Sequence, residues 1–92
     1  MKDQILKAAV TLAVRGGLNK LTRHAIAKAA KVSYGSVFNH LGDMPETRTA
    51  VIEYAVAHEI LPIIVDGIVA RHPAALGAPL ALRQKAMNAS LG

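Results

Sequence analysis

The chain has no cysteine and no tryptophan, one phenylalanine and two tyrosines. The absence of cysteine excludes disulfide bonds and thiolate chemistry, and it is compatible with a reducing cytoplasm, where we expect the protein to reside. The shortage of aromatic rings means that the core must be built from Ala, Val, Leu and Ile, which favours closely packed helices. With 92 residues, the chain is large enough for one modest core.

Long apolar segments are absent as well. The longest apolar-rich run, residues 60–70, contains Pro62 and Asp66, so it is too short and too interrupted for a membrane span. The first ten residues carry Asp3 and Lys7 and lack the apolar segment of a secretion signal. We therefore expect no contact with a membrane.

Sites for catalysis or metal binding are also missing from the sequence. The four histidines show no close metal-ligand spacing, and no cysteine joins them. The chain contains no Gly-rich phosphate loop and no nucleophile elbow, and its acidic residues are sparse and dispersed. We expect no enzymatic activity, no metal and no cofactor.

Acidic residues are especially scarce in the first half of the chain. Residues 1–42 hold seven basic side chains and one acidic side chain, a net charge of +6, whereas residues 43–92 hold four basic and five acidic ones, a net charge of −1. A basic half is the electrostatic signature of binding to a phosphate backbone. A solvated face or an acidic membrane surface would also suit this charge, but no helix combines a basic face with a bulky apolar one.

Two short helices joined by a tight turn are predicted in this basic half. Thr22 is a good N-cap for the first, over residues 23–30, and Ser33 for the second, over residues 34–41. Their small inner residues allow a close crossing, as a helix-turn-helix requires. The predicted inward positions are Ala25, Ile26, Ala29 and Ala30 in the first helix, Val32 in the turn, and Val37 and Leu41 in the second helix.

The outer side of the second helix suits the reading of DNA. Its polar or amphipathic residues are Tyr34, Ser36, Asn39 and His40. Asn can pair with adenine through two hydrogen bonds, and Ser can donate and accept. The helix N-termini at Thr22 and Ser33 offer backbone N–H groups to phosphate oxygens. An ordinary helical hairpin would show the same pattern, but its coincidence with the basic half favours double-stranded DNA as the partner.

Further helices are predicted on both sides of this motif. Asp3 is expected to cap a helix over residues 4–15, which Gly16 and Gly17 end. Gly42 ends the second helix of the motif, and Asp43 then caps a helix over residues 44–60, with Pro45 in its first turn and Glu46 three residues after the cap. The packing residues are expected to be Leu18 and Leu21 in the loop after the first helix, and Ala50, Val51, Tyr54, Ala55 and Ala57 or His58 in the longer one.

The last third of the chain is predicted to be helical with one loop. Pro62 either kinks the preceding helix or starts another segment that ends before Pro73. Residues 73–79 read as a loop, and a last helix follows over residues 79–90. The apolar side of this helix is predicted to consist of Leu80, Leu82, Ala86, Met87 and Leu91.

The fold class is therefore all-α: a three-helix unit with a helix-turn-helix, a longer fourth helix, and one or two short C-terminal helices. We assign DNA binding to residues 1–43, and packing and dimerisation to residues 44–92, within one compact domain. The apolar run 60–70 either packs within the chain or forms a self-association surface, and we favour a homodimer. A two-fold dimer would place two reading helices about 34 Å apart on one face of DNA.

Residues 5–54 resemble the DNA-binding domain of the TetR family of bacterial transcriptional regulators. The resemblance implies base or phosphate contacts from the second helix of the motif, and phosphate contacts from the start of the first. The matching positions are Ile5, Ala8, Ala9, Leu12, Gly17, Leu21, Thr22, Ile26, Ala27 and residues 32–41. The residues implied to contact DNA are Thr22, Arg23, Tyr34, Gly35, Ser36, Asn39 and His40.

Three positions depart from the usual pattern of that family. Lys31 stands in the turn where Gly is usual, Phe38 stands where Tyr is usual, and Met44 stands where Lys is usual. The last two changes each remove a phosphate contact. We hypothesise that Lys20, Lys28 and Lys31 compensate for this loss.

About thirty residues follow the fourth predicted helix, whereas family members carry a C-terminal domain of well over a hundred residues that binds an inducer. We therefore expect no small-molecule inducer. The predicted function is that of a small sequence-specific transcriptional regulator. We favour a repressor over an activator. The alternative is a protein-interaction adaptor or anti-repressor that retains the helix-turn-helix fold.

Overall fold

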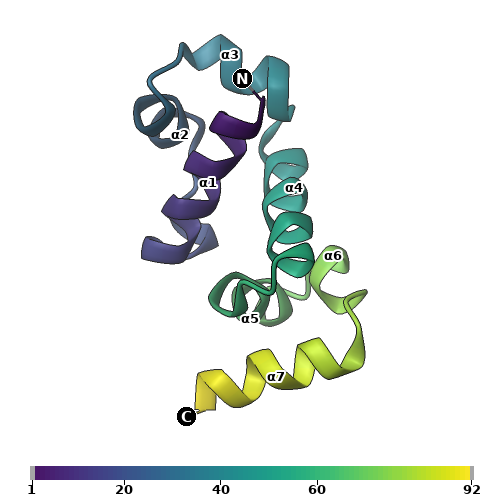
Figure 1. Cartoon of the computed structure of the whole chain (residues 1–92). Coiled ribbons are helices and arrows are strands. Elements are labelled where there is room, and N and C mark those ends of the chain that lie inside the picture. The colour runs from purple at the N-terminus through teal and green to yellow at the C-terminus, as the bar shows by residue number, and fades with distance from the viewer. Residues whose placement is uncertain (1, 92) are drawn as a thin grey trace.

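The computed structural model describes residues 2–91, with the side chains of residues 2–89. Every regular element within these residues is helical, which confirms the all-α prediction (Figure 1). None of these helices is long and apolar enough to cross a membrane. The elements are α1 (Lys2–Gly16), the 3₁₀ helix η1 (Leu18–Lys20), α2 (Arg23–Ala30), α3 (Tyr34–Leu41), α4 (Met44–Ala57), α5 (Leu61–Val69), α6 (Pro73–Leu76) and α7 (Leu80–Leu91).

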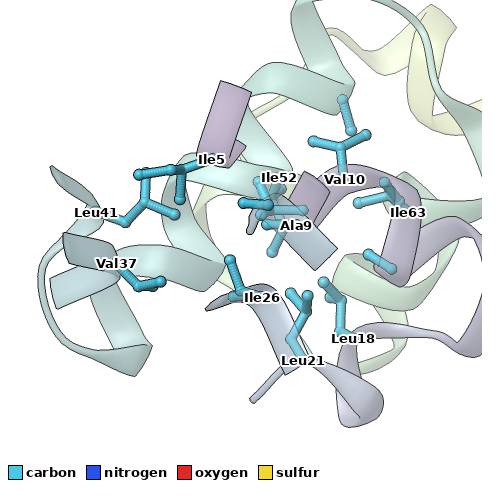
Figure 2. Packing of buried hydrophobic residues seen from close by; sticks show 14 of the residues in the cluster. Ile5, Ala9, Val10, Leu18, Leu21, Ile26, Val37, Leu41, Ile52 and Ile63 are labelled. Carbon is cyan, nitrogen blue, oxygen red and sulfur yellow. The ribbon is translucent and has the colours of Figure 1, made fainter. Parts of the chain in front are cut away.

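The helices form an elongated body of 38 × 22 × 19 Å. In Figure 1, α4 extends from the end that carries α2 and α3 to the opposite end, where α5, α6 and α7 pack. One core cluster joins both ends. Figure 2 shows Ile5, Ile26 and Val37, each fully buried, at the end of that cluster shared by α1, α2 and α3. The position of α3 is therefore fixed by the same core that holds the C-terminal helices.

The predicted N-caps of three helices are confirmed. The Ala25 amide donates to the Thr22 hydroxyl over 3.1 Å, and the Ser36 amide donates to the Ser33 hydroxyl over 3.1 Å. The Glu46 amide donates to the Asp43 carboxylate over 2.9 Å, and the Glu46 carboxylate in turn accepts from the Asp43 amide over 3.4 Å. Each cap satisfies a backbone donor that no preceding turn can reach, so each fixes where its helix begins.

Some predicted helix ends are wrong. The first helix begins at Lys2, so Asp3 lies in its first turn and does not cap it. The fourth ends at Ala57 and not at residue 60, because Glu59 adopts a left-handed backbone with φ of 53°. Pro62 therefore starts a separate helix, as the second of the two alternatives held. The predicted loop begins with α6, so three helices follow α4 where one or two were expected.

Several predicted packing positions are wrong as well, because the buried stripe of each helix depends on which neighbours cover it. Helix α4 packs against α1, α5 and α6, so its buried stripe is wider than a single helical face predicts. The exposed residues that were expected inside are Ala29, Ala57, His58 and Leu80. The buried residues that were not expected include Ala27, Thr47, Ile52, Ala75 and Ala78. The side chain of Leu91 lies outside the described residues. Leu18 and Leu21 are buried as predicted.

The apolar run 60–70 packs largely against other helices of the same chain. Ile63 and Ile64 of α5 are fully buried, and α5 packs closely against α7. Packing within the chain therefore accounts for most of the apolar surface in this run. Val69, which is 72% exposed, remains outside the core.

One hydrogen bond ties α5 to the loop between α1 and α2. The Leu18 amide donates to the Asp66 carboxylate over 3.3 Å, in a partly buried position. We expect Asp66→Ala to lower the free energy of unfolding by about 1 kcal/mol, because it leaves this amide without its partner. Asp66→Asn keeps an acceptor oxygen and should cost less in urea unfolding. Equal stability of the alanine variant and the wild type would contradict this role.

Candidate nucleic-acid interface

The two helices of the helix-turn-helix are set at an angle by a left-handed residue. Lys31 adopts φ of 60° and ψ of 43°, and its amide points back to the last carbonyls of α2. An L-residue in this conformation costs about 1 kcal/mol relative to Gly, which explains why Gly is usual at this turn in the family that the sequence resembles. The Gln4 side-chain amide donates to the Ala30 carbonyl over 3.0 Å and ties the end of α2 to α1.

Helix α3 is buried on one side only. Val37 and Leu41 face the core, so Gly35 and Asn39, four residues apart, lie on the opposite side. A Cβ added at Gly35 would meet no heavy atom within 4 Å. Gly inside a helix is less stable than Ala by about 0.5–1 kcal/mol, and no intramolecular contact requires it here. The outermost part of α3 is therefore flat, exposed and open to a close partner.

Hydrogen bonds order the other polar residues of α3. The hydroxyls of Ser33 and Ser36 lie 3.0 Å apart, and His40 Nδ1 lies 2.8 Å from the Ser36 carbonyl. Since a carbonyl only accepts, Nδ1 carries the proton, and Nε2 is an acceptor in the neutral ring. Within the described residues, no hydrogen bond engages the Asn39 side chain, so both its donor and its acceptor are free.

Aromatic and cationic side chains join the start of α2 to the face of α3. The Arg23 Cζ lies 5.1 Å from the centroid of the Tyr34 ring and 5.1 Å from that of Phe38. The His24 ring meets the edge of Tyr34 at 5.6 Å between centroids. Tyr34 and Phe38 are each about half exposed. His24 and Phe38 were not predicted as site residues, although Phe38 lies one turn after Tyr34 and His24 follows Arg23.

We give the name α2–α3 face to the start of α2 together with the N-cap and the outward sides of α3. It consists of Thr22, Arg23, His24, Ser33, Tyr34, Gly35, Ser36, Phe38, Asn39 and His40. Lys28 is exposed on α2, and Lys31 is exposed at its end. Lys20 lies elsewhere: its side chain covers Gly16, where an added Cβ would come within 2.7 Å of the Lys20 Cγ. Met44 packs against the core.

No cluster of His, Cys, Asp and Glu that could hold a metal ion lies on this face or elsewhere in the part of the chain that the structure describes. Its chemistry is that of exposed donors, acceptors and positive charges next to two helix N-termini. Such a surface suits phosphate and base edges.

Residues 5–44 match the family described as bacterial regulatory proteins, tetR family. This segment covers most of α1 and all of η1, α2 and α3, and it ends at the start of α4. The segment is therefore similar to the N-terminal helix-turn-helix domain of that family. None of the curated proteins and none of the solved structures compared with the chain matches it.

Proposed function

We propose that this chain, whose residues 5–44 are similar to a TetR-type helix-turn-helix domain, is a transcriptional regulator that binds double-stranded DNA by placing α3 in the major groove. The observation that carries the proposal is the outer side of α3, where Gly35 has open space around it and the side-chain amide of Asn39 is free. Repression is the favoured outcome, because it requires only that a DNA site be occupied.

The residues of the α2–α3 face divide between bases and phosphates. We assign base reading to Tyr34, Ser36, Asn39 and His40, with Gly35 allowing α3 to approach closely. Backbone N–H groups at the helix N-termini after Thr22 and Ser33 would bind phosphates. Phosphate contacts through side chains are assigned to Arg23, Lys20, Lys28 and Lys31.

We further propose that residues 44–92 mediate a homodimer, with residues 1–43 as the DNA-binding unit. Large apolar side chains remain exposed in the C-terminal helices: Val69 is 72% exposed, Leu80 60% and Leu76 42%. Covering them with a second copy would remove apolar surface from water and would pair two recognition helices. Sedimentation that depends on protein concentration would support the dimer, and a monomer at all concentrations would contradict it.

The function is tested by selecting binding sequences from a random duplex pool with purified protein. Enrichment of a palindrome with half-sites about one helical turn apart is expected for a dimeric regulator. Binding without enrichment would indicate an architectural role instead. If no duplex is retained even at low salt, the proposal fails and the protein-interaction adaptor becomes the better explanation.

The contribution of the lysines is separable from that of base reading. We expect Lys28→Ala and Lys31→Ala each to weaken binding similarly on all sequences, and to reduce the slope of log affinity against log salt by about one. Lys85→Ala is the control, because Lys85 pairs with Glu59 over 3.1 Å on the C-terminal half. An unchanged slope in both variants would show that these lysines do not compensate for the missing phosphate contacts.

A further inference from the structure

We infer that Arg23 is a positioning residue of the interface: its guanidinium fixes the two aromatic rings that α3 presents and is itself held ready for a phosphate. This inference rests on the proposed function, and it assigns Arg23 a role that differs from that of a mobile surface cation. It also gives Phe38, which has no polar atom to offer to DNA, a part in recognition.

The geometry of the cluster supports this role. Tyr34 and Phe38 are four residues apart on α3, so their rings lie on the same side of the helix. Arg23 is the first residue of α2, and its guanidinium carbon lies 5.1 Å from both ring centroids. One side chain thus connects the beginning of α2 to the first two turns of α3. Attraction between a guanidinium and the faces of aromatic rings requires this close placement.

The hydrogen bonding of Arg23 also supports its positioning role. Its Nε is buried and has no hydrogen-bond partner, so contact with the rings, and not a polar bond at this atom, holds the side chain. Within the described residues no carboxylate pairs with Arg23. Its charge is therefore free for an anion, next to the free amides of the first turn of α2. A fixed guanidinium loses less freedom than a flexible lysine when it binds a phosphate.

The matched test replaces Arg23 by Lys, which keeps the charge, and by Met, which keeps length without charge. On a duplex obtained from the pool, we expect Arg23→Lys to lower the affinity about tenfold with an unchanged salt slope. We expect Arg23→Met to lower both the affinity and the slope, the latter by about one. Arg71→Lys, at an exposed arginine of the C-terminal half, should behave as the wild type.

A second readout isolates positioning from charge. In the free protein, Arg23→Lys should shift the ring proton resonances of Tyr34 and Phe38, while the melting temperature shows that each variant is folded. Combining Arg23→Lys with Phe38→Leu should cost less affinity than the two single losses multiplied, because both remove the same contact.

The outcomes separate this inference from the proposed function. Wild-type protein that binds no duplex would defeat both. Wild-type binding with Arg23→Lys at full affinity would overturn the positioning role alone and leave Arg23 as a point charge. Independent losses from Arg23→Lys and Phe38→Leu would likewise overturn it.

Discussion

Replacing Ile52 with alanine is expected to lower the free energy of unfolding by about 2–5 kcal/mol, the range found when a large aliphatic side chain is removed from a packed core. Ile52 lies on α4 and is fully buried. It lies close to Gly67 of α5, where an added Cβ would be 3.4 Å from the Ile52 Cδ1. Loss of this side chain would leave a cavity where α4 meets α5. Small domains are only marginally stable, so the variant should be partly unfolded at moderate temperature.

The measurement is urea unfolding followed by circular dichroism, with two companion variants. Ile52→Val removes one methylene group and should cost about 0.5–1.5 kcal/mol. Glu53→Ala changes the next residue of α4, which is exposed, and should stay within about 0.5 kcal/mol of the wild type. If Ile52→Ala proved no more destabilising than Ile52→Val, the packing between α4 and α5 would be looser than the structure shows.

Ile52 also illustrates what local sequence signals do not reveal about the fold. The caps at Thr22, Ser33 and Asp43 act through hydrogen bonds within three residues, so sequence alone locates the starts of α2, α3 and α4. Burial of Ile52 depends on helices that approach α4 from separate directions, one of them distant in sequence. The left-handed turn at Glu59 cannot be predicted from local sequence signals either, because no glycine stands at this position.

The candidate site likewise combines features that the sequence predicts with features that depend on how the helices pack. Polar residues on the outer side of α3 follow from helical periodicity, and so does their grouping with Thr22 and Ser33. The contacts of Arg23 with Tyr34 and Phe38 depend on the crossing of α2 and α3. The placement of Lys20 is another feature that the sequence does not predict: its stem packs back over Gly16, and its contact with DNA stays a prediction.

Gly35→Ala is expected to stabilise the protein and to weaken its binding to DNA. The Cβ would enter open space on α3, and alanine is the better helix former, so the free energy of unfolding should rise by about 0.5–1 kcal/mol. On DNA the same methyl group would stand between the helix backbone and the groove. It would push Asn39 away from its base, and losing one bidentate base contact costs about tenfold to a hundredfold in affinity.

Gly67→Ala is the matched control, because it makes the same chemical change in a helix of the C-terminal half. There the added Cβ would come within 2.7 Å of the Ala75 Cβ, so this variant should lose about 1–3 kcal/mol of stability and, while folded, keep its affinity for DNA. The two stability changes have opposite signs because an added Cβ has open space at Gly35 but meets the Ala75 Cβ at Gly67. A Gly35→Ala protein that gains stability and still binds DNA as tightly as the wild type would show that the outer side of α3 does not approach the groove.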